Sequence, residues 1–322
     1  MLVTGAGGFL GTRIVQRFSA HGARVRAVLH AGSTAPASMA AAHEQVRIEL
    51  RESSELESAF RDHDLVVHAA ALTRAHGPDG GRLMETVNVE MTRNVIEACR
   101  RAGVPRLVHV SSTAAIGISP DPRTPADERF TFNLGDLGLS YNVSKRNSEQ
   151  LALDANGAGL EVVVVNPGFV FGWHEPRYRG GEVISRVLNT SPVVCTGGGL
   201  SMVHVDDVVA GIVQAADRGR GGERYILSGD NRSFREIADT VLRVAGVRRR
   251  ILAMPDRARD LLGRVSNARA RRRGAPPNLV LDGRYAYQYY SSEKAAAELG
   301  YQRRPFESIV EDFLGGGRSD AG

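Results

Sequence analysis

The stretch TGAGGFLG, residues 4–11, carries three glycines at the spacing G-x-x-G-x-x-G, as Gly5, Gly8 and Gly11. It follows the strand-like run MLVT and opens the amphipathic run FLGTRIVQRFSAHG (9–22). Glycines at a strand-to-helix turn let the backbone bend sharply and approach a pyrophosphate, whose charge the helix N-terminus then stabilises. The stretch therefore predicts the first strand–turn–helix unit of a nucleotide-binding sheet.

Short β-branched runs alternate with amphipathic runs through the first half of the chain. The strand-like runs are 1–4, 24–29, 46–50, 65–70, 106–112 and 160–166, and the helix-like runs between them are 9–22, 55–62, 83–103 and 140–159. This alternation predicts an α/β fold, a doubly wound parallel sheet of the Rossmann type with helices on both faces. Its ligand should lie beyond the carboxyl ends of the strands.

The pattern changes after residue 166. Further helices are predicted at 181–190, 206–217, 233–246 and 305–314, and further strands at 202–205 and 224–228. We expect residues 1–165 to form the dinucleotide-binding domain, with its sheet rejoined by about 201–228. Residues 166–200 and 229–322 should then form a smaller, discontinuous substrate-binding lobe. The segment 263–278, rich in Arg, Gly and Pro, reads as a loop.

Composition excludes several classes of protein. The 322 residues are 42% hydrophobic and carry a net charge of +5. The arginines are spread out, and no aromatic residues interleave with the clusters at 248–250 and 268–273, so nucleic acid is not an expected partner. Cys99 and Cys195 lie far apart and suggest neither a disulfide framework nor a metal site; a reducing cytoplasm fits best. No signal peptide or run of ~18 uncharged apolar residues is present.

Three later motifs lie near strand ends or helix starts. HAAA (68–71) offers small residues that leave room for a flat ligand, and VSSTAAIG (110–117) offers hydroxyls to a substrate oxygen. YNVSK (141–145) spaces Tyr141 and Lys145 by one helical turn, in a chain with only two lysines. A compact ammonium near a phenol would lower the phenol's pKa, which makes a usable acid and base.

As an ordered set, these motifs and the later NPGFVFG, MVHVDDVV and YSSEKA resemble the extended short-chain dehydrogenase/reductase family, the NAD-dependent epimerase/dehydratase group. The resemblance covers nearly the whole chain and implies an enzyme in which Tyr141 is the general acid/base. It further implies that Lys145 binds the nicotinamide ribose, that Ser112 rather than Ser111 orients the substrate oxygen, and that Asn88 supports the lysine. The cofactor-binding residues that it implies are Gly5, Gly8, Phe9, Leu10, Gly11, His30, Glu49, Leu50, Ala69, Ala70, Ala71, Lys145, Pro167, Gly168 and Val170.

The choice of dinucleotide depends on the end of the second strand. NAD-preferring relatives end this strand with an acidic residue on the ribose, whereas this chain has Leu29 and His30. We expect NADP(H), although no arginine stands at His30 and NAD(H) remains the alternative. Glu49 and Leu50 fall where the family has an Asp-Leu pair beside the adenine.

The substrate class is indicated by two departures from the nucleotide-sugar branch. Ser201 stands where that branch has a diphosphate-binding arginine, and the later Arg-x-Gly-Asp motif is missing, although Arg284 lies near. GGGLSMVHVDDV instead resembles the dihydroflavonol reductase-like and 3β-hydroxysteroid dehydrogenase-like branch. We expect a ketoreductase or alcohol dehydrogenase for a hydrophobic or polyketide-like small molecule. A nucleotide-sugar epimerase or dehydratase with tightly bound NAD and a non-catalytic dinucleotide sensor are the alternatives, and a homodimer is possible.

Overall fold

The computed structural model describes residues 1–32, 37–52, 55–73, 80–174, 177–273 and 275–316. Its main sheet has seven parallel strands in the order β11-β6-β5-β4-β1-β2-β3. The strands are β1 (Leu2–Thr4), β2 (Arg26–Leu29), β3 (Glu44–Arg47), β4 (Val66–His68), β5 (Arg106–Val110), β6 (Glu161–Pro167) and β11 (Arg224–Leu227). The chain starts at β1, runs to the β3 edge and then crosses to β4. The strand order therefore reverses between β1 and β4, where a doubly wound sheet binds its ligand.

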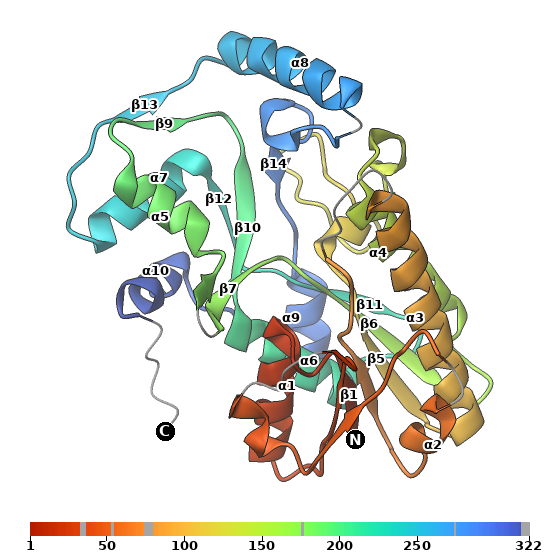
Figure 1. Ribbon diagram of the computed structural model, residues 1–322. Coiled ribbons are helices and arrows are strands. Elements are labelled where there is room, and N and C mark those ends of the chain that lie inside the picture. The colour runs from red at the N-terminus through yellow and green to blue at the C-terminus, as the bar shows by residue number, and fades with distance from the viewer. Residues whose placement is uncertain (33–36, 53–54, 74–79, 175–176, 274, 317–322) are drawn as a thin grey trace.

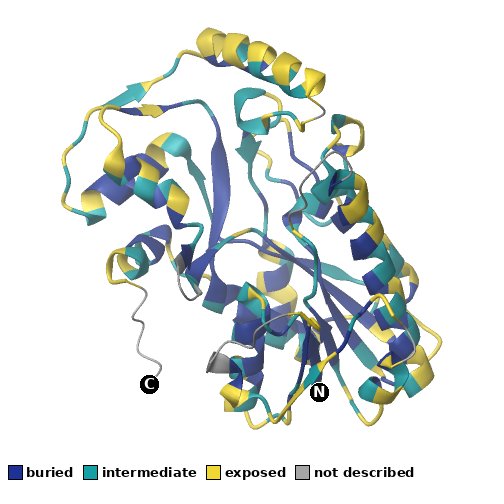
Figure 2. Cartoon of the chain, in the orientation of Figure 1, coloured by how far each residue is buried: buried dark blue, intermediate teal, exposed yellow. Residues whose placement is uncertain are grey.

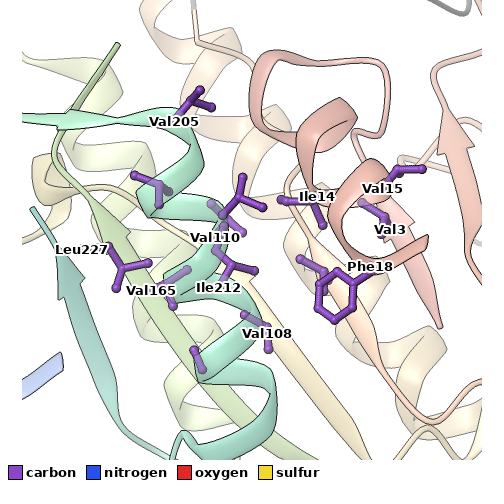
Figure 3. Packing of buried hydrophobic residues seen from close by; sticks show 14 of the residues in the cluster. Val3, Ile14, Val15, Phe18, Val108, Val110, Val165, Val205, Ile212 and Leu227 are labelled. Atoms are coloured by element: carbon purple, nitrogen blue, oxygen red, sulfur yellow. The ribbon is translucent and has the colours of Figure 1, made fainter. Parts of the chain in front are cut away.

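Helices cover both faces of this sheet (Figure 1). One face carries α1 (Phe9–Ala20), α6 (Val205–Arg218) and α9 (Glu293–Leu299), and the other carries α2 (Leu56–Phe60), α3 (Gly80–Ala102) and α4 (Ser140–Asp154). Because the sheet is buried on both sides, its central strands are apolar throughout: Val162 to Val165 of β6 are fully buried. Figure 3 shows Ile14 and Phe18 of α1 and Ile212 of α6 packed over Val108 and Val110.

A second lobe is built around a smaller sheet. Its elements are β7 (Phe169–His174), β8 (Arg177–Arg179), α5 (Gly181–Asn189), β9 (Val193–Cys195), β10 (Gly199–His204), β12 (Asp230–Ser233), α7 (Phe234–Val244), β13 (Ile251–Ala253), α8 (Asp256–Arg272), β14 (Tyr287–Gln288) and α10 (Phe306–Leu314). Strands β12, β10, β7 and β8 pair in that order, β14 adds to β10, and β13 pairs with β9. Figure 1 shows this lobe above α1 and the main sheet. Four short 3₁₀ turns complete the elements: η1 (Ala37–Ala41), η2 (Thr113–Ala115), η3 (Gly135–Leu137) and η4 (Leu279–Leu281).

Two sequence-based expectations about these elements are correct only in part: both predicted strands are present, and the end of the segment 263–278 is a loop. The run 202–205 lies mostly in β10, which pairs with β7, β12 and β14 rather than with the main sheet; only β11 rejoins that sheet, beside β6. The segment 263–278 is not a loop throughout, because α8 continues to Arg272. Arginine is a good helix former, and the Pro residues of the segment come only after the helix. Gly274 lies outside the described residues.

The N-terminus of α7, in the second lobe, is fixed by reciprocal hydrogen bonds. Ser233 caps α7 by accepting from the Glu236 amide, and the Glu236 side chain accepts from the Ser233 amide in return. No helix in the part of the chain that the structure describes is both long and apolar enough to cross a membrane.

Candidate active site

The turn between β1 and α1 requires glycine at two of its positions. Gly5 has a φ of +66°, and a Cβ there would lie 2.6 Å from the backbone N and Cα of Ala70 at the end of β4. A Cβ on Gly11 would lie 2.0 Å from the Gly5 carbonyl oxygen, so this glycine lets α1 pack closely on the turn. α1 begins after Gly8 with no side chain capping it. The turn and the helix N-terminus together suit a pyrophosphate.

A cleft of about 520 Å³ opens beside this turn, over the ends of β2, β3 and β4. Its walls include eight residues that the sequence analysis named: Gly5, Gly8, His30, Glu49, Leu50, Ala69, Ala70 and Ala71. Its other wall residues are Gly7, Val28, Leu29, Ile48, Arg51, Leu72, Leu83, Val87 and Met91. Leu83, Val87 and Met91 are spaced by four on α3, the spacing of a single helix face, so helical periodicity could have found them.

Seven of the implied cofactor-binding residues do not line this cleft. Two of them lie elsewhere in the site: Lys145 is buried on α4, and Gly168 lines the second pocket described below. The other five lie in packing positions. Phe9 and Leu10 pack against the core under α1, and Gly11 makes the close approach described above. Pro167 is buried at the end of β6, and Val170 of β7 packs against the same core. The structure therefore brings together the nucleotide residues of β1 to β4 but leaves this group in packing positions.

The end of the cleft near β2 and β3 is lined by a histidine, a carboxylate and an arginine: His30, Glu49 and Arg51. His30 Nε2 lies 3.2 Å from Glu49 Oε2, and His30 Nδ1 accepts from the Gly32 amide. Arg51 lines the same cleft, and its side chain pairs with Glu90 at 3.4 Å. The end of β2 thus has no carboxylate, but Glu49, just after β3, places its carboxylate beside His30.

Ser112 and Tyr141 meet between the end of β5 and the start of α4. The Tyr141 phenol lies beside the Ser112 hydroxyl, which lowers the pKa of the phenol. Two further contacts hold the two segments together: the Ser112 hydroxyl accepts from the Ala114 amide at 3.2 Å, and the Asn142 side chain donates to the Ala114 carbonyl at 3.1 Å. Ser111 instead points its hydroxyl into the interior, where no described residue hydrogen bonds to it. The geometry favours Ser112 as the substrate-facing serine.

Lys145 lies under this pair, 3% exposed, and its ammonium donates to the Val110 carbonyl at 2.9 Å. Burial lowers the pKa of Lys145 to about 8, and the nearby Glu149 carboxylate acts in the opposite direction. The ammonium is therefore still mostly protonated at pH 7. A compact group is needed in so enclosed a place, and an arginine fork would have to displace its surroundings.

The pKa of Tyr141 departs from the sequence-based expectation. Burial raises the pKa of the phenol, and the hydrogen bond from Ser112 lowers it by less. The expected lowering by Lys145 is not seen, because the ammonium is directed to the Val110 carbonyl and desolvation of the phenolate dominates. The Tyr141 phenol is therefore neutral at physiological pH in this structure.

Asn88 connects α3 to the loop after β4 and to α4. Its side-chain oxygen accepts from the Leu72 amide at 2.7 Å, and its nitrogen donates to the Leu72 carbonyl and to the Ser144 hydroxyl, each at 3.0 Å. Ser144 precedes Lys145 on α4. Asn88 therefore ties the cleft wall at Leu72 to the helix that carries the lysine. Asn88 thus contacts the Ser144 side chain on this helix, whereas the Lys145 ammonium donates to the Val110 carbonyl.

A buried ion pair behind Ser112 was missed by the sequence analysis. Asn166 of β6 donates to the Ser112 carbonyl at 3.0 Å and also to the Glu149 carboxylate. Glu149 is fully buried and pairs with Arg224 at 2.8 Å. The three side chains come from β6, α4 and β11, and no local motif signals that they meet.

A second pocket, of about 230 Å³, adjoins Ser112 and Tyr141. Its walls also include Thr113, Ala114, Ile118, Asn142, Gly168, Phe169, Leu200, Ser201, Leu279, Gln288 and Tyr290. Neither arginine nor lysine is among these described wall residues. Arg284 lies in a neighbouring cavity of about 420 Å³, which shares Leu279 with this pocket, and pairs there with Asp282.

The glycine turn, the cleft at the β1/β4 reversal and the Ser112–Tyr141–Lys145 group together define a dinucleotide-dependent oxidoreductase. The chain belongs to the NAD dependent epimerase/dehydratase family, whose model matches residues 1–228, and so to the extended short-chain dehydrogenases/reductases. It is an enzyme of this type and uses a nicotinamide dinucleotide.

Three similar proteins extend this assignment. Sterol demethylase protein B of Methylococcus capsulatus is 32% identical over 80% of this chain and 77% of its own length. A 4-hydroxy-2-methyl-3-oxo-4-farnesyl-3,4-dihydroquinoline-1-oxide ketoreductase of Stigmatella aurantiaca is 30% identical over 94% of this chain and 91% of its own. The crystal structure of gox2253 is 31% identical, superposes with a TM-score of 0.84 and covers 99% of both chains.

Proposed function

We propose that this NAD(P)-dependent oxidoreductase reduces a ketone, or oxidises the corresponding secondary alcohol, on a hydrophobic or polyketide-like small molecule. The observation that carries the proposal is the pocket beside Ser112 and Tyr141, whose described walls hold no arginine or lysine. Ser201 lies in that wall, with its hydroxyl buried. A sugar nucleotide would need a cationic partner for its diphosphate there. The relative from Stigmatella aurantiaca, named a ketoreductase of a farnesylated quinoline, supports the same substrate class.

The roles that we propose for the side chains follow from their contacts. A reduced nicotinamide, when bound, supplies a hydride to the carbonyl carbon of the substrate. Tyr141 gives its phenolic proton to the carbonyl oxygen, and Ser112 donates a hydrogen bond that positions this oxygen. Lys145 binds the ribose of the dinucleotide, and Asn88 holds the helix that carries this lysine. A neutral, buried phenol is suited to proton donation, which favours the reductive direction.

NADP(H) is the proposed dinucleotide, with NAD(H) as the alternative. The end of β2 has His30 in place of a carboxylate, and Arg51 adds a cation to the same cleft. The Glu49 carboxylate at this end of the cleft contacts the His30 ring at 3.2 Å. His30 at this position thus accommodates a 2'-phosphate better than an acidic residue would, because a carboxylate would repel the phosphate.

We further propose that residues 166–200 and 229–322 supply the substrate lobe, apart from α9, which packs on the main sheet. We also propose that the protein forms a homodimer and that it works in a reducing cytoplasm. Six of the pocket's wall residues come from that lobe: Gly168, Phe169, Leu200, Leu279, Gln288 and Tyr290. Cys99 and Cys195 are both free and buried, which fits a reducing compartment. Light scattering on the purified chain tests the dimer.

The test of the proposed reaction is a panel of ketones and nucleotide sugars, assayed with NADPH and with NADH. Turnover of apolar ketones by protein that is purified without bound dinucleotide supports the reductase. The epimerase alternative is supported if the dinucleotide copurifies, survives dialysis and is accompanied by conversion of a nucleotide sugar. Binding of NADPH without turnover of any substrate would leave the sensor alternative, although both Tyr141 and Lys145 are present.

A further inference from the structure

Helix α8 presents apolar side chains to the outside of the molecule. Leu261, Leu262 and Val265 are 63%, 48% and 44% exposed. Val265 follows Leu262 by three residues and Leu261 by four, so the three side chains lie next to one another on the helix surface. Figure 1 shows α8 along the outer edge of the second lobe, and Figure 2 shows it mostly exposed. An exposed apolar face on a protruding helix indicates an interaction surface.

Arginines surround this apolar face. Arg257, Arg264, Arg269 and Arg272 are exposed on α8, and none forms an ion pair with a residue that the structure describes. Arg259 differs, because it is buried against the body of the protein and pairs with Asp256 and Asp260. Helix α8 therefore combines three large exposed apolar side chains with four exposed arginines that form no ion pair with a described residue; Arg264 among them also borders the cavity between α8 and residues 281–284.

The inner side of α8 contacts the wall of the substrate pocket. A Cβ on Gly263 would lie 2.2 Å from the Leu281 carbonyl oxygen, so the helix packs directly on η4. Leu279, at the start of η4, lines the pocket that contains Ser112 and Tyr141. The short turn η4 is thus the segment that lies between the exposed helix and the candidate active site.

We infer that α8 docks on an anionic lipid surface, with Leu261, Leu262 and Val265 at the acyl–headgroup boundary and the four arginines at the lipid phosphates. Arginine suits this position because its long stem lies along apolar surface while the guanidinium reaches the headgroups. A second copy of the chain is a poor occupant, because a two-fold contact through this face would oppose arginine to arginine. The inference rests on the proposed function, since a membrane-dissolved ketone would then have a short path to the pocket at Leu279.

Flotation with vesicles tests the inference on the full-length protein. The vesicles are phosphatidylcholine alone, or phosphatidylcholine with roughly one third phosphatidylglycerol, at low and high salt. One variant removes the apolar face: Leu261→Gln, Leu262→Gln and Val265→Gln. A second removes the charges: Arg257→Gln, Arg264→Gln, Arg269→Gln and Arg272→Gln. Matched controls change exposed residues elsewhere: Leu314→Gln for the first, and Arg101→Gln, Arg123→Gln, Arg129→Gln and Arg235→Gln for the second.

The wild-type protein and both controls should float with the anionic vesicles, and high salt should release them. Each α8 variant should bind these vesicles at least about tenfold more weakly. Failure of the wild-type protein to bind anionic vesicles, or unchanged binding by either α8 variant, would overturn the inference. So would a dimer, detected by light scattering, that the apolar variant dissociates.

The fate of the proposed function is read separately, from turnover of a water-soluble ketone. Both α8 variants should keep this turnover, because none of the changed side chains lines the pocket. If the wild-type protein binds vesicles but reduces no ketone, the proposed reaction fails while the docking surface stands.

Discussion

The Tyr141 phenol lies beside the Ser112 hydroxyl across the gap between α4 and the end of β5, and both side chains line one pocket. The Ser112 hydroxyl also accepts from the Ala114 amide, so the serine is oriented before any substrate oxygen arrives. Two hydroxyls held against each other form a site that a carbonyl oxygen can enter by accepting from both.

Replacing Tyr141 by Phe tests the proton donor. The ring and its packing are kept, so the variant should fold as the wild-type protein does and bind dinucleotide with similar affinity. Loss of the proton donor should lower kcat by roughly 100-fold or more. Steady-state kinetics with a reducible ketone, together with circular dichroism, give the answer. Near-normal turnover in a folded variant would show that another group donates the proton.

Replacing each serine of the pair by Ala tests which one faces the substrate. Ser112 lines the pocket, whereas the Ser111 hydroxyl is buried away from it. Ser112→Ala should lower kcat far more than Ser111→Ala, whose effect should fall mainly on stability. The assignment is wrong if the order of the two kcat values is reversed.

His30→Asp tests where the adenosine ribose lies. The new carboxylate would stand beside Glu49, whose carboxylate is 3.2 Å from the His30 ring. Two neighbouring negative charges repel a 2'-phosphate and offer acceptors to a 2'-hydroxyl, so the ratio of kcat/KM values should move toward NADH by about tenfold or more. Glu49→Gln is the matched control and should move the ratio toward NADPH. An unchanged ratio in both variants would place the ribose elsewhere.

The buried histidines of β4 and β5 predict loss of stability in acid. Burial lowers the pKa of His68 to about 3 and lowers that of His109 well below its usual value, with the Lys145 cation acting in the same direction on both. In the unfolded chain both would titrate near ~6.5, so the unfolded state binds more protons as the pH falls below this value. The free energy of unfolding should therefore be highest above about pH 7. As the pH falls below ~6.5, it should decrease by up to ~1.4 kcal/mol per pH unit for each histidine.

His109→Gln is the variant that isolates this contribution. No described residue hydrogen bonds to either nitrogen of the His109 ring, whereas His68 contacts Thr4 and Thr92. Urea unfolding at pH 7.5 and pH 5 should show a smaller difference between the two pH values for His109→Gln than for the wild-type protein. Equal differences would mean that His109 is not buried in its neutral form.

The α/β fold and the nucleotide cleft could be read from the sequence because their signals are local. Strand and helix periodicity depend on residues a few positions apart, and the glycines at 5 and 11 respond to a turn formed by their own neighbours. The order of the motifs then places the ends of β1 and β4 together, where Gly5 meets Ala70. The separation of Tyr141 from Lys145 is likewise set by one helical turn.

Only the tertiary structure decided how distant segments pair. β10 is a buried, apolar strand that fits either sheet by composition, and its partners β7 and β12 could not be chosen from sequence. Asn166 and Glu149 meet Arg224 across three elements, and the free energy of that contact depends on burial, which no local pattern encodes. The outward side of α8 is set in the same way: Gly263 packs on Leu281 eighteen residues further on, and this contact turns Leu261 and its neighbours away from the core.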